Sequence, residues 1–216
     1  MNLPNRITLS RLVVGALLFV FLSLEIQGWG VGSRHLALNI AAAVFVICVA
    51  TDWVDGWIAR RTGSVTDFGR IADPFVDKIV VCGTCIYLVT LTPQLMKPGY
   101  VVVLVGREFL VTGLRGFIES RGLPFGARWG GKAKMVLQSV TIPAILLFEA
   151  NKDALAGYPG WVLSFERFTV ILVVLTIAAT VLSAWDYIAV ALRALRDNRS
   201  AVAPPASPAA RPSETK

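Results

Sequence analysis

The sequence predicts an all-α integral membrane protein with six transmembrane helices and cytoplasmic N- and C-termini. Three observations lead to this prediction. First, 55% of the 216 residues are hydrophobic and only 16% are charged, whereas a soluble domain has about a quarter of its residues charged. Second, the apolar residues come in blocks that approach the roughly 20 residues needed to cross a bilayer. Third, basic residues gather in alternate connections between these blocks.

Six apolar segments follow one another along the chain, and none has the alternation of a β-strand. In lipid, only helices or a closed barrel satisfy every backbone hydrogen bond, so we expect helices. Within the first segment, the apolar run from Leu12 to Leu24 follows Arg6 and Arg11 as in a signal peptide, but no small-residue cleavage site comes after it, so we interpret it as a retained span. The segments are Ile7–Leu24, Leu36–Thr51, Pro74–Leu91, Tyr100–Ile118, Ala133–Ala150 and Phe168–Leu192.

The distribution of arginine and lysine predicts the orientation. The N-terminus, the second and fourth connections and the C-terminal tail are rich in basic residues, whereas the first, third and fifth connections carry one or two each. By the positive-inside rule, the basic parts face the cytoplasm. The cytoplasmic basic residues are then Arg6, Arg11, Arg60, Arg61, Arg70, Arg121, Arg128, Lys132, Lys134, Arg193, Arg196, Arg199 and Arg211.

We expect one membrane domain over residues 1–195 and a disordered cytoplasmic tail over residues 196–216, because the end of the chain is rich in Ala, Pro and Ser. No basic stripe with interleaved aromatic residues is present, so nucleic acid is not an expected partner. The net charge of +7 fits membrane lipids and a phosphorylated substrate better. Cys82 and Cys85 have the spacing of a redox or zinc pair, but without a second Cys/His pair we interpret them as small apolar residues of a membrane helix.

Four aspartates around the second connection form the most informative pattern. Asp52 and Asp55 are three residues apart, and Asp73 and Asp77 are four apart. Both spacings put the two side chains of a pair on one helix face. The first pair ends the second span and the second pair begins the third, so an antiparallel hairpin would bring four carboxylates together near the membrane surface.

Converging carboxylates repel each other, and divalent cations relieve that repulsion. Oxygen-only ligation suits Mg²⁺ or Mn²⁺, and a pair of such ions serves in-line phosphoryl displacement. A carboxylate that is left partly free can act as general base on a hydroxyl. Gly56 and Gly69 leave room for a nucleotide near the backbone, and Arg60 can pair with a phosphate.

The stretch from Asp52 to Asp77 resembles the signature of the CDP-alcohol phosphotransferase family, D-x2-D-G-x2-A-R-x8-G-x3-D-x3-D, at every specified position. The resemblance implies a homodimeric transferase that attacks the diphosphate of a CDP-linked lipid with an alcohol and releases CMP. It implies two metal ions on Asp52, Asp55, Asp73 and Asp77, with Asp77 also the general base. It further implies a CDP-diacylglycerol pocket lined by Asn5, Thr8, Gly56, Ala59, Arg60, Thr66 and Gly69.

Charged residues in the fourth and fifth segments indicate the acceptor alcohol. Charges within a span are costly and usually functional, and adjacent helix residues do not face each other, so a simple Arg107–Glu108 pair is not what we expect. Arg-Glu-Phe and Gly-Lys-x-Lys resemble the glycerophosphate branch of the family, although Met135 stands where that branch commonly has Thr. The residues expected to bind the acceptor phosphate are Arg107, Arg115, Lys132 and Lys134.

The resemblance therefore implies transfer of the phosphatidyl group from CDP-diacylglycerol to sn-glycerol 3-phosphate, giving phosphatidylglycerophosphate and CMP. The active site would face the cytoplasm from the cell inner membrane. Two alternatives stay within the family, with phosphatidylglycerol or inositol phosphate as acceptor. A membrane transporter is the alternative of another class, but its acidic residues would be scattered through mid-membrane depth, often at broken helices.

Overall fold

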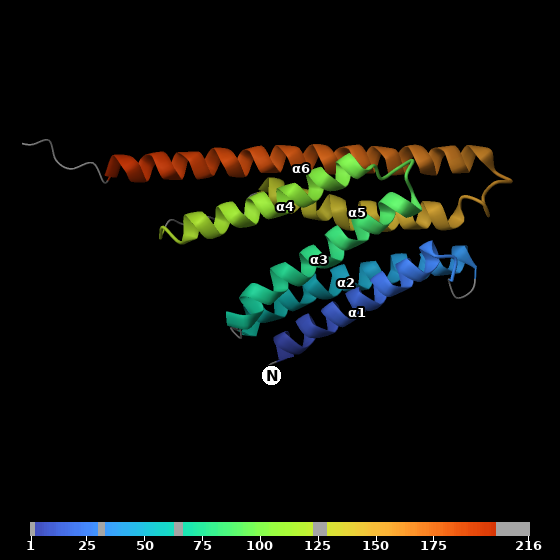
Figure 1. The fold of residues 1–216 in the computed structure, drawn as a ribbon, viewed down its shortest axis with the longest axis horizontal. Helices are drawn as coiled ribbons and strands as arrows, with labels where there is room; N and C mark the ends of the chain where they lie inside the picture. The colour runs from blue at the N-terminus through green and yellow to red at the C-terminus, as the bar shows by residue number, and fades with distance from the viewer. Residues whose placement is uncertain (1–2, 30–32, 63–66, 123–128, 202–216) are drawn as a thin grey trace, which may run out of the picture.

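The computed structural model describes residues 3–29, 33–62, 67–122 and 129–201 (Figure 1). Side chains are described for residues 9–29, 33–51, 75–122, 129–193 and 196. All structural statements below concern these parts of the chain. Within them every regular element is an α-helix, so the predicted all-α class is confirmed.

Six helices correspond one to one to the six predicted apolar segments, and each is longer than its segment. The largest differences are at the C-terminal end of α2, at the N-terminal end of α3 and at both ends of α6. Consecutive helices run in opposite directions (Figure 1). Their bounds are α1 Leu3–Ile26, α2 Arg34–Thr62, α3 Asp67–Leu91, α4 Pro98–Glu119, α5 Trp129–Asn151 and α6 Pro159–Ala201.

Helix α5 lies against both α2 and α6 and so joins the two sides of the bundle. Helix α1 packs on α2 and α3, and α4 packs on α6 and α3. The main core is built from Leu, Ile, Val and Phe side chains of all six helices, among them Leu22, Phe45, Leu88 and Ile145, which are fully buried. A smaller apolar cluster joins α4 to the C-terminal half of α6.

The outer surface of the bundle is also apolar. Phe109, Val102 and Leu182 are 74%, 70% and 69% exposed, and a helix that is hydrophobic all round is typical of a membrane span. Four helices are long and apolar enough to cross a membrane: α1, α2, α5 and α6. Helix α4 is long enough as well, but it carries Arg107, Glu108 and Arg115. The structure therefore supports a membrane protein with several spans.

Two glycines let α1 and α3 approach each other closely. A Cβ atom on Gly15 would lie 2.7 Å from Val80 Cγ2, and one on Gly83 would collide with the ring of Phe19. Small residues at helix crossings are a common device in membranes, because packing rather than water exclusion holds the helices together there. This crossing positions α3, which carries Asp77.

The C-terminal end of α6 overlaps the start of the predicted tail. Helix α6 continues to Ala201, so residues 196–201 are helical, and residues 202–216 lie outside the described residues. Ala, Leu and Arg, which favour helices, dominate residues 191–196. In addition, Tyr187 and Ala191 are buried against Val111 and Ile118 of α4, and this packing stabilises the extension.

At the end of the bundle where α2 begins and α5 ends, one carboxylate binds three donors from different parts of the chain. Glu149 of α5 is 4% exposed and accepts hydrogen bonds from Arg34 at 2.9 Å, Lys152 at 2.8 Å and Gln94 at 3.1 Å. These donors come from the start of α2, the end of α5 and the segment between α3 and α4. A buried carboxylate with this many donors is well satisfied, so it fixes the relative heights of α2, α3 and α5.

Candidate active site

The two aspartate pairs lie deeper in their helices than the apolar segments predicted. Asp52 and Asp55 are ten and seven residues before the end of α2, and Asp73 and Asp77 are six and ten residues after the start of α3. At 1.5 Å per residue, the pairs are about 9–15 Å from the turn. The distances from the turn match, so the antiparallel backbone brings the pairs to the same level, as expected.

Most of the signature residues are placed by their backbone alone. The side chains of Asp52, Asp55 and Asp73 lie outside the described residues, and so do those of the residues expected to bind CDP-diacylglycerol. Thr66 is outside the described residues altogether. The others are helical, Asn5 and Thr8 in α1, Gly56, Ala59 and Arg60 in α2, and Gly69 in α3.

Asp77 is half-buried and lines a small, partly open cavity between α2, α3, α4 and α5. The polar residues of the wall come from three helices, so the cavity brings together groups that are up to 62 positions apart in the chain. Its remaining wall is apolar. The lining residues are Val49, Asp77, Lys78, Val81, Cys82, Glu108, Lys134, Met135, Gln138 and Ser139. The predicted base and one predicted acceptor-binding lysine therefore share one cavity.

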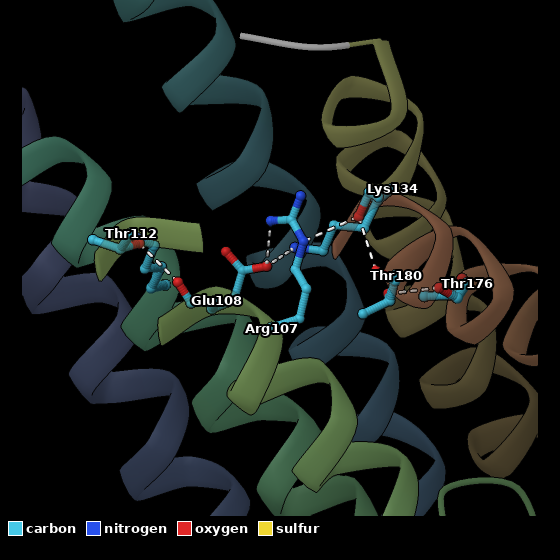
Figure 2. Close-up of polar contacts among 8 residues, drawn as sticks. Arg107, Glu108, Thr112, Lys134, Thr176 and Thr180 are labelled. Atoms are coloured by element: carbon cyan, nitrogen blue, oxygen red, sulfur yellow. Dashed lines mark hydrogen bonds and ion pairs between the residues drawn. The ribbon is translucent and has the colours of Figure 1, made fainter. Parts of the chain in front are cut away.

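Glu108 is the centre of the charged cluster in this wall. Its Oε1 atom accepts hydrogen bonds from Arg107 Nη1 at 3.2 Å and from Lys134 Nζ. Figure 2 shows the carboxylate turned toward both cations, which come from α4 and α5. Two cations and one anion leave the cluster with a net positive charge, which suits an anionic ligand.

The expectation that Arg107 and Glu108 do not pair is wrong. The Cα–Cβ bonds of adjacent helix residues point in different directions. The long side chain of Arg107 nevertheless turns back, and its Nη1 donates to Glu108 Oε1 at 3.2 Å. Arg107 is 8% exposed and is also held by Ser183 Oγ, which accepts from its Nε at 3.0 Å, and by the ring of Tyr187, whose centroid is 5.4 Å away.

One donor of Arg107 remains open. Its Nη2 atom is buried, and no residue that the structure describes accepts a hydrogen bond from it. Gly131 leaves room beside this atom, since an added Cβ there would lie 3.5 Å from Nη2 and 2.9 Å from the Tyr187 hydroxyl. A buried donor without a partner costs free energy, so this atom is well suited to an oxygen supplied by a ligand.

The other two predicted acceptor-binding cations are placed differently. Arg115 is half-buried, and its Nε atom also has no acceptor among the described side chains and backbone groups. Lys132 is exposed at the start of α5, where its Nζ lies 5.2 Å from the centroid of the Trp129 ring. The structure therefore brings Arg107 and Lys134 together through Glu108 and leaves Lys132 outside this cluster.

Three further polar residues of the cavity were not assigned a role from the sequence. Lys78 Nζ donates to Thr112 Oγ1 at 2.6 Å and so connects α3 to α4. Glu108 bridges the two cations, and Gln138, which is 3% exposed, is one of the residues that line the cavity. A charge or an amide within an apolar span is costly. This cost is the sequence signal from which Lys78, Glu108 and Gln138 could have been predicted as site residues.

Carboxylate donors suit Mg²⁺ or Mn²⁺. Among the described side chains no group of three His, Cys, Asp or Glu residues is found, because three of the four predicted ligands lie outside them. The backbone levels of the two pairs and the half-buried carboxylate of Asp77 fit a shared ion site. All three cysteines are free, with Cys48 and Cys85 buried, as their apolar interpretation requires.

Comparison with known proteins finds, along nearly the whole chain, the family whose signature the aspartate pattern resembles. Residues 1–192 match the model of the CDP-alcohol phosphatidyltransferase family. The chain is 35% identical over 195 residues to the CDP-diacylglycerol–glycerol-3-phosphate 3-phosphatidyltransferase of Bacillus subtilis, covering 86% of this chain and 93% of that protein. It is 36% identical over 198 residues to a probable phosphatidylglycerophosphate synthase of Mycobacterium tuberculosis H37Rv, covering 91% and 83%. A Pseudomonas fluorescens protein with the same name as the B. subtilis enzyme is 32% identical over 174 residues, covering 79% and 82%.

Proposed function

The chain belongs to the CDP-alcohol phosphatidyltransferase family, and we propose that it transfers the phosphatidyl group of CDP-diacylglycerol to sn-glycerol 3-phosphate. The products are phosphatidylglycerophosphate and CMP, and the reaction is a step of phospholipid biosynthesis. One observation carries the choice of acceptor. Asp77 and the Glu108-linked Lys134 line the same cavity, so a hydroxyl and an anionic group of one small molecule can be bound together. The names of the relatives agree with this acceptor.

The reacting groups follow from this arrangement. The free primary hydroxyl of glycerol 3-phosphate gives its proton to the Asp77 carboxylate, which acts as general base. The hydroxyl oxygen forms a bond to the lipid-side phosphorus, and the bond from that phosphorus to the bridging oxygen breaks. The electron pair of the broken bond leaves with CMP. Membership of the family removes the transporter alternative.

The acceptor phosphate binds on the cationic side of the cavity. Lys134 has three N–H donors and uses one of them on Glu108. Arg107 keeps Nη2 open and Arg115 keeps Nε open, and charge-assisted hydrogen bonds to phosphate are among the strong ones. Glu108 orients Arg107 and Lys134 while the site is empty of substrate, so fewer side-chain rotamers have to be ordered on binding. Lys132, which is exposed and lies outside the Glu108 cluster, attracts the anionic acceptor electrostatically as it approaches the cavity.

Asp52, Asp55, Asp73 and Asp77 would hold two divalent cations, Mg²⁺ or Mn²⁺. The matched backbone levels of the two pairs and the oxygen-only donor set support this assignment. Bound ions would supply charge neutralisation for the diphosphate. Asn5, Thr8, Gly56, Ala59, Arg60, Thr66 and Gly69 would line the nucleotide pocket.

We also propose six transmembrane spans in the inner membrane, with both termini and the active site on the cytoplasmic side. The antiparallel course of the helices brings the start of α1, the end of α2, the start of α3 and the C-terminal end of α6 to one end of the bundle (Figure 1). Arg193 and Arg196 lie at this end of α6, and the positive-inside rule puts it in the cytoplasm. A homodimer, as the family resemblance implies, remains a prediction.

The function is tested with purified protein, CDP-diacylglycerol and a panel of acceptors. Glycerol 3-phosphate, inositol phosphate and phosphatidylglycerol are supplied separately, and both the CMP released and the lipid product are measured. We expect CMP and phosphatidylglycerophosphate with glycerol 3-phosphate alone. CMP release with one of the other acceptors and none with glycerol 3-phosphate would retain the family chemistry and refute the proposed acceptor.

A further inference from the structure

Gln138 is a buried polar residue of the cavity, and none of the described residues is its hydrogen-bond partner. It lies on α5, one helical turn after Lys134, and its side chain is 3% exposed. It lines the cavity together with Asp77 and Lys134. Its Nε2 atom is buried, and no hydrogen-bond acceptor for it exists among the described parts of the chain. This absence separates Gln138 from the other polar residues of the same helix.

The neighbouring polar groups of α5 are satisfied within the protein. Thr141, one turn further along, shares a hydrogen bond of 2.7 Å with Thr176 of α6. Ser139 donates to the carbonyl oxygen of Val136 at 2.8 Å. A buried amide without a partner costs free energy, and an apolar side chain of similar shape would be at least as stable. Packing therefore does not explain a glutamine at position 138, whereas a ligand in the cavity does.

The chemistry of the amide indicates which part of a ligand it meets. A glutamine amide offers both donors and an acceptor, so it complements a hydroxyl, which also donates and accepts. A phosphate only accepts, and Lys134, Arg107 and Arg115 already provide cationic donors for it. A neutral amide also avoids the cost of a further charge inside the bundle.

We infer that Gln138 binds the secondary hydroxyl of glycerol 3-phosphate and thereby determines specificity for a polyol phosphate. This inference rests on the proposed function. With the primary hydroxyl at Asp77 and the phosphate at the Lys134 side, the central carbon of the three-carbon chain lies between the two anchors. Gln138 lines the same cavity as Asp77 and Lys134. Its amide Nε2 is buried and has no hydrogen-bond acceptor among the described residues.

The test compares two acceptors in wild type, Gln138→Met and Thr141→Val. The acceptors are glycerol 3-phosphate and 3-hydroxypropyl phosphate, which lacks only the secondary hydroxyl. Methionine keeps the length of glutamine and removes the amide. Thr141→Val is the matched control, since it removes a buried polar group of α5 that has a partner. For each protein, kcat/KM for both acceptors, KM for CDP-diacylglycerol and the unfolding temperature are measured.

In wild type, glycerol 3-phosphate should have a kcat/KM about two- to ten-fold above that of 3-hydroxypropyl phosphate, the range expected for one neutral hydrogen bond. In Gln138→Met this ratio should fall to about one, with KM for CDP-diacylglycerol unchanged and an unfolding temperature equal to or above that of wild type. Thr141→Val should keep the wild-type ratio and unfold at a lower temperature.

The opposing outcomes are distinct. A wild-type ratio retained in Gln138→Met refutes the contact with the secondary hydroxyl. An altered KM for CDP-diacylglycerol at an unchanged ratio refutes it as well, and assigns the amide to the lipid substrate. If Gln138→Met does not fold, Gln138→Leu replaces it, and failure of both to fold refutes the inference, because an unpaired amide is not needed for stability. If wild-type protein makes no product from glycerol 3-phosphate, the proposed function itself fails and the inference falls with it.

Discussion

Glu108 on α4 and Lys134 on α5 form an ion pair in which the two side chains are 12% and 6% exposed. Removing one partner of such a pair leaves a charge buried without compensation, which typically costs about 3–5 kcal/mol. Glu108 also holds Arg107, so its loss leaves two cations unpaired at once. The pair therefore contributes to the stability of the bundle as well as to the shape of the site.

We predict that Glu108→Ala lowers the free energy of unfolding by about 3–5 kcal/mol. The measurement is unfolding of the purified protein in detergent, followed by circular dichroism. The double variant Glu108→Ala with Lys134→Ala should recover part of the loss, because one of the two unpaired cations is then gone. Equal stability of Glu108→Ala and the double variant would show that the unpaired charge of Lys134 is not a source of the loss.

Activity should require a divalent cation. The reason is the predicted convergence of Asp52, Asp55, Asp73 and Asp77, which oxygen-binding ions would neutralise. EDTA is expected to abolish CMP release, and excess Mg²⁺ or Mn²⁺ should restore it. Full activity in the chelator would rule out the two-ion mechanism.

Replacing Asp77 with Asn should abolish the base while preserving shape. General-base catalysis typically contributes 10²–10⁴-fold, so kcat should fall by about that factor. The affinity for the nucleotide, measured by binding of CDP in the presence of Mg²⁺, should fall much less. Asp52→Asn should weaken metal binding in addition. Near-normal turnover of Asp77→Asn would remove the role assigned to this residue.

The open donors of Arg107 and Arg115 should matter mainly for the acceptor. A charge-assisted hydrogen bond contributes about 1.5–3 kcal/mol, so Arg107→Ala and Arg115→Ala should each lose roughly ten- to hundred-fold in kcat/KM for glycerol 3-phosphate. KM for CDP-diacylglycerol should change much less.

Arg121→Ala is the control for these two variants. Arg121 is an exposed arginine just beyond the end of α4, and its guanidinium lies 4.6 Å from the centroid of the Phe117 ring. Its removal should leave the kinetics of both substrates near wild type. If Arg107→Ala and Arg115→Ala instead lose CDP-diacylglycerol affinity and keep that for glycerol 3-phosphate, the two substrates bind in the reverse arrangement.

The orientation in the membrane can be measured directly. A reporter fused after Lys216 should appear on the cytoplasmic side, because the tail and the end of α6 carry Arg193, Arg196, Arg199 and Arg211. A second fusion within the connection between α5 and α6 should appear on the opposite side. The same side for both fusions would contradict the proposed six spans.

The elements that depend on local sequence were predicted correctly. Apolar runs of about 20 residues are enough to specify membrane helices, because each helix satisfies its own backbone hydrogen bonds. All six runs are helices. Their ends were less accurate, since charged and polar stretches such as residues 52–62 continue a helix beyond the apolar run. At the C-terminal end of α6, residues 193–201 continue the helix beyond its apolar run in the same way.

By itself, the sequence determined the helix count, the family signature and the candidate chemistry of Asp77, because these depend on spacing within one or two neighbouring helices. Only the tertiary structure decided that Glu108 bridges Arg107 and Lys134, and that Gln138 lines the same cavity without a partner among the described residues. These contacts depend on the rotation and height of helices that are distant in the chain. That packing is set by many small steric fits, such as the close approach of α1 and α3, which no periodicity in the sequence records.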